Sequence, residues 1–206
     1  MPVQNENIIY ESNMIDYFDF IPDPASLEEA TKFLDTDGRV EIVGKFQEDS
    51  SRANKNGRKY KGVWKKVLSD PSLIERMQLG HVFGELDHPL DGATKLSRCS
   101  HLVTGLHLRE DGEVHGKLVL LETTAGKNAK AIYKGGGRPG VSSRGAGSVN
   151  KLTNEVQEDY KFHTFDIVAD PSTHGAYPTP TNLGSSIQQI PMGSFQTPQL
   201  RIVKED

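Results

Sequence analysis

The sequence predicts an α+β fold, in which a mainly antiparallel β-sheet or barrel carries several helices. Several segments alternate apolar and polar residues as strands do, and Asp111-Gly112 between two of them is a strong hairpin signal. Other segments repeat apolar residues at helical spacing. The 206 residues are enough for one core, so we expect one domain over residues 1–172 and a poorly ordered C-terminal tail over residues 173–206.

Local signals mark where the helices begin. Ser26 and Glu29 form a capping box, in which each residue satisfies a backbone N–H at the start of a helix. A longer helical pattern breaks at Asp70-Pro71, because proline suits the first turn of a new helix. The expected helices cover residues 26–34, 62–80 with that break, and 126–133.

The strand-like segments follow from period-two alternation. The earliest should point Val40 and Ile42 inward. Beyond Pro171 the chain is rich in Pro, Ser, Thr, Gly and Gln and has little periodicity, which is why we expect a tail there. The expected strands or extended segments cover residues 39–46, 81–87, 100–108, 114–122, 141–149 and 160–169.

Composition excludes several classes of protein. Lys and Arg number 24 against 28 Asp and Glu, and the net charge of −4 argues against a nucleic-acid binder. The single cysteine, Cys99, cannot form an internal disulfide, and the N-terminus MPVQNENIIYE lacks the features of a signal peptide. No stretch reaches the ~18 apolar residues of a membrane span. We therefore expect a soluble protein of a reducing cytoplasm.

A glycine-rich stretch, YKGGGRPGVSSRGAGSV, raises the question of phosphate binding. Gly135, Gly137 and Gly140 satisfy G-x-G-x-x-G, but that motif needs a strand before it and a helix after it. The residues that follow form helices poorly, and Pro139 lacks an N–H that a phosphate would need. The interpretation that remains is a strand that presents Ser142 or Ser143.

A nucleophilic serine needs a base, and His88 is the histidine best suited to that role. It lies in GELDHP, where the following proline restrains the backbone at the end of an extended segment. Proton transfer requires such rigid placement, because it works only within about 2.6–3.2 Å.

The motifs GELDHP, GVSSRGAGS and FDIVADPS, with RANKNGRKYKGVWKKVL upstream, together resemble the prohead core protein proteases of T4-type tailed phages. These are serine peptidases similar in fold to assemblin, the herpesvirus maturation protease. The resemblance spans about residues 40–176. It implies a protease domain packaged inside the immature capsid, in the host cytoplasm, that removes scaffold and trims capsid proteins.

Matched residue by residue, the resemblance implies a catalytic triad. His88 matches the general base, Ser142 the nucleophile, and Asp166 the third member that orients the imidazole. His163 is the alternative third member, because the herpesvirus enzymes use a histidine there. The order His, Ser, Asp along the chain also differs from that of chymotrypsin, subtilisin and the α/β-hydrolases. The expected oxyanion donors are the backbone of Ser143 or Gly145 together with Arg144.

The resemblance also implies cleavage after glutamate with an apolar residue two positions earlier. The phage scaffold and major capsid proteins would be the substrates, and we expect no cofactor, metal, membrane or specific nucleic-acid partner. Self-processing is expected in the C-terminal tail, at Glu205, because an extended segment is more accessible than the helical segments that contain Glu29 and Glu75.

Three alternatives stay open at this point. A metal-dependent hydrolase would use the acidic residues and histidines that lie within and just before the GELDHP motif, although Pro89 spoils the helical spacing of the H-E-x-x-H sites. A thiol–histidine pair could form on one strand face, and a non-catalytic capsid or scaffold component would need neither site. The residues concerned are His81, Glu85, Asp87 and His88 for the metal, and Cys99 with His101 for the thiol.

Overall fold

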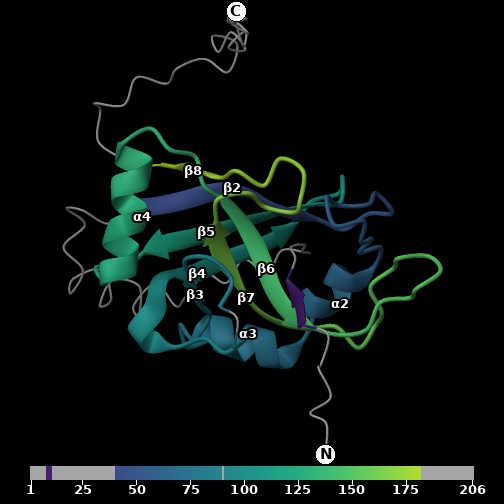
Figure 1. The fold of residues 1–206 in the computed structure, drawn as a ribbon. Helices are drawn as coiled ribbons and strands as arrows, with labels where there is room; N and C mark the ends of the chain where they lie inside the picture. The colour runs from purple at the N-terminus through teal and green to yellow at the C-terminus, as the bar shows by residue number, and fades with distance from the viewer. Residues whose placement is uncertain (1–7, 11–39, 90, 182–206) are drawn as a thin grey trace, which may run out of the picture.

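The computed structural model describes residues 8–10, 40–89 and 91–181. In this part of the chain, two antiparallel sheets pack together with helices at their margins (Figure 1). The helix expected over residues 26–34 and most of the expected C-terminal tail lie outside the described residues.

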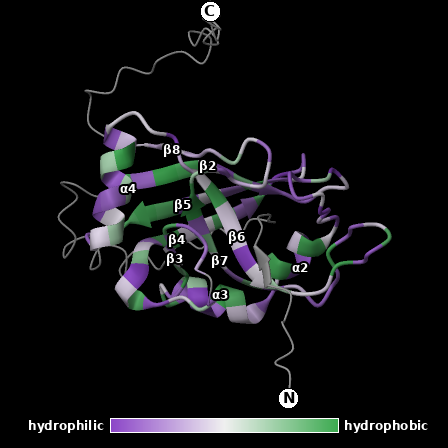
Figure 2. Cartoon of the chain, in the orientation of Figure 1, coloured by the Kyte–Doolittle hydropathy of each residue, from purple (hydrophilic) through white to green (hydrophobic). Residues whose placement is uncertain are grey.

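The larger sheet has five strands in the order β3-β4-β5-β2-β8. The predicted hairpin joins β4 to β5 through Asp111-Gly112, and β5, which lies in the middle of the sheet, is apolar toward its C-terminal end (Figure 2). Val40 and Ile42 of β2 are buried, as their alternation predicts. The strands are β2 (Val40–Glu48), β3 (Phe83–Glu85), β4 (Cys99–Leu108), β5 (Glu113–Leu120) and β8 (Thr179–Pro180).

The smaller sheet has three strands in the order β1-β6-β7. The glycine-rich stretch forms its central strand, β6 (Gly140–Ala146), and β7 (Lys161–Val168) pairs with it antiparallel. The third strand, β1 (Ile8–Tyr10), pairs with the far end of β6 and has no counterpart among the expected strands.

The helices expected over residues 62–80 and 126–133 form where the sequence predicts them. The break at Pro71 separates two helices, and the Asp70 side chain accepts a hydrogen bond of 2.9 Å from the Ser72 N–H to cap the second one. Thr123 caps the last helix in the same way, through the Gly126 N–H. The helices are α2 (Val63–Leu68), α3 (Pro71–Gln78), the 3₁₀ turn η1 (Leu96–Arg98) and α4 (Thr124–Lys134).

Aromatic side chains fill the space between the sheets and α2. Trp64 of α2 is fully buried, with ring centroids 5.3 Å from those of Tyr160 and Phe162. Phe165 of β7 packs edge-on against Phe46 of β2 at 5.0 Å. These contacts connect the smaller sheet to the larger one and fix the position of β7.

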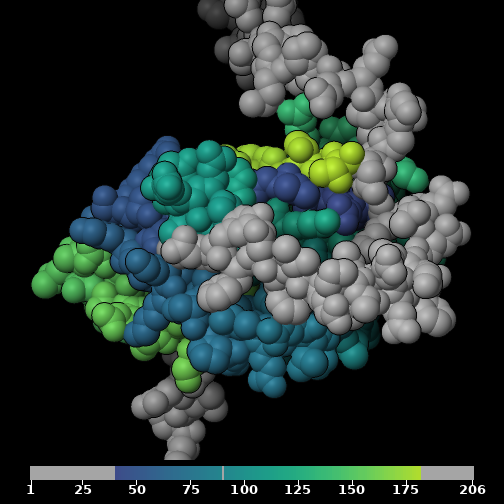
Figure 3. Space-filling model, turned by 180° about the vertical axis from the view of Figure 1, so that it is seen from behind, coloured from purple at the N-terminus to yellow at the C-terminus, as the bar shows by residue number. Residues whose placement is uncertain are grey.

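Two expectations about the architecture need correction. In the described residues the two sheets do not close into a barrel. Strand β3 of the larger sheet approaches β7 of the smaller one only through an isolated parallel bridge between Leu86 and Ile167, which is too short to make one continuous sheet. The folded domain also continues past residue 172: Ala176 is fully buried, and β8 pairs with β2, beside which it lies in the view of Figure 3. No helix of the described residues is long and apolar enough to cross a membrane.

Candidate active site

Two neighbouring strands of the smaller sheet bring a serine and an aspartate to one face. Ser142 of β6 lies directly opposite Asp166 of β7 in the antiparallel register. Side chains of directly opposed residues point to the same side of a sheet. Both are buried: Ser142 is 3% exposed and Asp166 is fully buried.

The loop after β3 places His88 between these two side chains. The N–H of Asp87 donates a 2.8 Å hydrogen bond to the Ile167 carbonyl, so this loop is anchored to β7 one residue before the histidine. Asp87 adopts a left-handed conformation with φ 58°, which turns the chain toward the sheet. His88 Nε2 then lies 3.1 Å from Ser142 Oγ, and Nδ1 lies 2.8 Å from Asp166 Oδ2.

This chain of hydrogen bonds has the geometry of a charge-stabilised proton relay. With Nδ1–H donating to the Asp166 carboxylate, the other ring nitrogen accepts from the Ser142 hydroxyl. Such an arrangement can take the hydroxyl proton as the oxygen attacks a carbonyl carbon, and can later return it to a leaving amine.

Asp166 remains an anion although it is buried. Burial alone would raise its pKa, but the hydrogen bond from His88 and the charge and hydrogen bonds of Arg144 outweigh burial and hold the pKa below its usual value of 3.8. The N–H of Glu85 adds a 3.0 Å hydrogen bond to Oδ1. The aspartate is therefore both ionised and fixed in orientation.

Arg144 lies two residues after Ser142 on the same strand face, and its guanidinium forms a bidentate ion pair with the Asp166 carboxylate. Nε donates to Oδ2 of Asp166 at 2.8 Å and a terminal nitrogen donates to Oδ1 at 3.0 Å. The same group reaches the Gly92 carbonyl and the Thr94 hydroxyl in the loop that follows His88. Its side chain is fully buried in these contacts, which does not fit the expected oxyanion role for the guanidinium.

A second ion pair ties the same loop to β3. Glu85 is almost fully buried, and its carboxylate accepts hydrogen bonds of 2.7 Å from both the Arg98 Nε and the Lys95 N–H. Arg98 also pairs with Asp91 at 2.9 Å. The loop that carries the histidine is thus held at both of its ends. The Glu85 carboxylate, considered above as a metal ligand, is instead engaged in these contacts.

The two adjacent serines have different surroundings, as do the two candidates for the third triad member. Ser143 points to the opposite face, where its hydroxyl lies 3.2 Å from that of Tyr160 in the core. His163 is exposed, and its carbonyl accepts a hydrogen bond from Arg76. The structure therefore brings Ser142, not Ser143, and Asp166, not His163, to His88. The expected oxyanion role of the Ser143 and Gly145 N–H groups stays a prediction.

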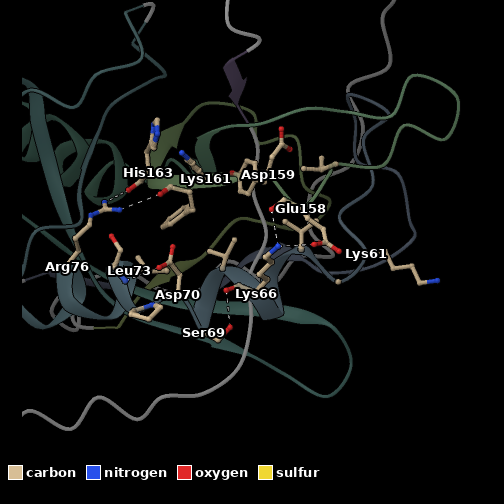
Figure 4. Close-up of a pocket in the computed structure, with 18 residues that line it drawn as sticks. Lys61, Lys66, Ser69, Asp70, Leu73, Arg76, Glu158, Asp159, Lys161 and His163 are labelled. Atoms are coloured by element: carbon tan, nitrogen blue, oxygen red, sulfur yellow. Dashed lines mark hydrogen bonds and ion pairs between the residues drawn. The ribbon is translucent and has the colours of Figure 1, made fainter.

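His163 borders a separate hollow of about 990 Å³ (Figure 4). It opens between α2, α3 and the start of β7, and the charged side chains around it have both signs. Arg76 spans it to the carbonyls of β7, and Lys66 pairs with Glu158 at 3.0 Å. None of the residues that line it belongs to the Ser–His–Asp cluster.

One buried histidine beside the site was not predicted. His101 is fully buried, and its Nε2 bonds the Phe165 carbonyl at 3.0 Å while Nδ1 lies 2.8 Å from the Ser100 hydroxyl. Burial lowers its pKa to about 4, so the ring is neutral near pH 7. The expected partner, Cys99, contacts the Lys95 carbonyl instead. Among the described residues, no three His, Cys, Asp or Glu side chains are grouped so that they could hold a metal ion.

Comparisons with known proteins show the family to which this chain belongs. The family model described as "Prohead core protein serine protease" matches residues 17–188. The solved structure of the bacteriophage T4 capsid assembly protease, gp21, is similar with a TM-score of 0.55 and 25% sequence identity, covering 62% of this chain and 80% of that one. Among curated proteins, none matches this chain. Because the family model spans most of the sequence, the chain belongs to the prohead core protein serine proteases, and it is a serine protease of phage capsid maturation.

Proposed function

We propose that Ser142, His88 and Asp166 are the catalytic triad of this protease, with the roles of nucleophile, general base and orienting anion. The observation that carries the proposal is the unbroken chain of hydrogen bonds, 3.1 Å from Ser142 Oγ to His88 Nε2 and 2.8 Å from Nδ1 to Asp166. A hydroxyl has little nucleophilicity until a base removes its proton, and this arrangement supplies the base and keeps its tautomer.

In the proposed reaction, the Ser142 oxygen attacks the scissile carbonyl carbon while His88 takes the hydroxyl proton. The Asp166 anion stabilises the imidazolium that forms. His88 then protonates the leaving amine, and water hydrolyses the acyl-enzyme by the same steps in reverse. The negative charge on the carbonyl oxygen is held by the N–H of Ser143, the residue after the nucleophile, as in other serine hydrolases.

The substrates proposed for this site are the scaffold and major capsid proteins inside the prohead, cut after glutamate, and the chain itself. The relation in fold to the herpesvirus maturation protease is part of the same proposal. It is supported by the order His, Ser, Asp along the chain and by a nucleophile placed on a strand.

The adjacent serines provide a matched pair of variants to test the assignment. We expect Ser142→Ala to abolish cleavage of a glutamate-containing peptide, because the relay then has no nucleophile. Ser143→Ala should keep a measurable rate, since its hydroxyl contacts Tyr160 in the core. Steady-state rates of the two variants, with circular dichroism to verify folding, make the comparison. Activity in Ser142→Ala together with its loss in Ser143→Ala would reverse the assignment.

A further inference from the structure

The hollow bordered by α2, α3 and the start of β7 has an apolar base. Val67 of α2, Leu73 of α3 and Phe162 of β7 line it, and each of them is buried. Its volume of about 990 Å³ is that of a site that can enclose a ligand. The base can therefore accept an apolar side chain of a bound segment.

The acidic side chains around the hollow are engaged within the chain. Glu158 pairs with Lys66 at 3.0 Å. Asp159 accepts a hydrogen bond of 3.0 Å from the Ser148 N–H, which holds the pKa of this carboxyl below its usual value. Asp70 caps α3. In the described chain, none of these carboxylates forms an ion pair with the other cations that line the hollow.

Arg76 of α3 is a half-buried cation whose bonded partners are uncharged. One terminal nitrogen donates to the Phe162 carbonyl at 3.4 Å, and the other donates to the His163 carbonyl (Figure 4). Burial lowers the pKa of Arg76, and the charge of Asp70 offsets only part of this effect. A partly desolvated cation is stabilised when a carboxylate binds it, and a guanidinium with five N–H groups has donors left for one.

Two lysines add positive charge at the rim. Lys161 at the start of β7 and Lys61 before α2 are exposed, and within the described ranges neither forms an ion pair. Figure 4 shows Lys61 extending away from the other labelled side chains, so it contributes to the electrostatic field and not to direct contact. The hollow thus combines an apolar base with cations that have no internal counter-charge, which fits a segment with carboxylates and an apolar side chain.

β7 connects the hollow to the proposed triad. His163, whose carbonyl bonds Arg76, lies three residues before Asp166 on this strand, a separation of about 10 Å at the rise of a strand. A few extended residues can span such a distance. A single polypeptide can therefore be held in the hollow while another part of it lies at Ser142.

We propose that this hollow is an exosite, a second substrate-binding site, for an acidic segment of the protein substrates. The inference rests on the proposed function, in which those substrates are proteins cut after glutamate. A carboxylate of the segment accepts hydrogen bonds from Arg76 and pairs with Lys161, and an apolar neighbour packs on Val67 and Phe162. Because the exosite adds binding free energy without contacting the scissile bond, it lowers KM and leaves kcat unchanged.

Binding to the full chain that carries Ser142→Ala tests the exosite without cleavage. The probe is a fluorescent peptide with the core Glu-Leu-Glu-Glu, compared by anisotropy with its counterpart Gln-Leu-Gln-Gln. We expect the glutamate peptide to bind more tightly, and added salt to weaken its binding. Arg76→Gln should raise its Kd by about tenfold and Lys161→Gln by about threefold. Lys65→Gln removes the same charge from α2 outside the hollow and should leave the Kd unchanged.

Cleavage by the chain with Ser142 in place gives a second test. Each peptide is joined through a Gly-Ser linker to the same cleavable glutamate sequence. The glutamate form should have a KM several-fold lower than that of the glutamine form, with equal kcat. This difference in KM should disappear in Arg76→Gln and persist in Lys65→Gln, with circular dichroism to verify folding. If Arg76→Gln does not fold, Lys161→Gln should still reduce the difference, because its side chain makes no ion pair that the fold depends on.

The outcomes separate the exosite from the proposed triad. Equal binding of the two peptides, or equal weakening by Arg76→Gln and Lys65→Gln, overturns the exosite. Tighter binding of an oligonucleotide of equal charge, or a dimer that Arg76→Gln dissociates, overturns it too, because the hollow then serves nucleic acid or a second copy. A chain that cleaves both peptides without discriminating between them overturns the exosite and leaves the proposed triad intact. A chain that binds as expected but cleaves neither supports the exosite and contradicts the proposed triad.

Discussion

Replacing Asp166 by asparagine removes one negative charge and little volume from the centre of the site. The amide can still approach His88, but its NH₂ group can donate to Nδ1, which puts the ring proton on Nε2. That nitrogen then cannot accept the Ser142 proton. In a Ser-His-Asp protease the same change lowers turnover on the order of 10⁴-fold, and we expect a comparable loss in this protein.

The substitution also destabilises the fold, and the structure indicates by how much. Arg144 is fully buried and makes two of its hydrogen bonds to the Asp166 carboxylate. Removing one partner of a buried ion pair costs about 3–5 kcal/mol in the free energy of unfolding, because the remaining charge is left uncompensated. Thermal unfolding of Asp166→Asn should report this loss.

Arg144→Gln is the matched control, because it breaks the same ion pair but leaves the Asp166–His88 hydrogen bond. Its free energy of unfolding should fall by a similar amount. Its turnover should fall only about 10- to 100-fold, which is the usual effect of removing a residue that supports a reacting group without itself contacting the substrate. The assay is hydrolysis of a glutamate-containing peptide at saturating concentration, at a temperature where both variants are folded by circular dichroism. Equal losses of turnover in the two variants would refute a specific role for Asp166.

Three further predictions concern the surroundings of the site. Burial lowers the pKa of His101 to about 4, so between that pH and about 6.5 the unfolded chain binds a proton that the folded chain does not. The free energy of unfolding should therefore fall by about 3 kcal/mol as the pH drops through this window. Denaturant unfolding at several pH values should show that His101→Gln lacks this pH-dependent loss. A Cβ on Gly84 would lie 2.1 Å from both the Phe165 carbonyl oxygen and His101 Nε2, so Gly84→Ala should lower the melting temperature strongly or prevent folding. His163→Ala should keep near-normal turnover, since that side chain lies away from the triad; a loss as large as that expected for Asp166→Asn would make the histidine the third member.

Elements with strong local signals could be predicted from the sequence. Asp70 caps the helix that begins at Pro71, and a cap followed by proline is visible in any single sequence. The strands β1 and β8 have three and two residues, too few for a period to be recognised. Closure into a barrel depends on pairing between distant strands, so the sequence could not decide it.

The residues of the site also divide into those that local sequence predicts and those whose place depends on how the sheets pack. His88, Ser142 and Asp166, which the structure brings together, could be predicted through motifs, because each of the three lies within its motif. Arg144 shares the face of Ser142 by strand alternation, so its contact with the opposite strand could have been inferred from the expected β-pairing. The burial of His101 depends on how one sheet packs on the other, and nothing in its immediate neighbours distinguishes it from a surface histidine.

The most direct test of the account is to identify the residue that a fluorophosphonate modifies in the full chain. We predict one adduct, on Ser142, found by peptide mass spectrometry, with the modification lost in His88→Ala and strongly slowed in Asp166→Asn. An adduct on Ser143, or labelling of Ser142 that proceeds at the same rate without His88, would contradict the proposed triad.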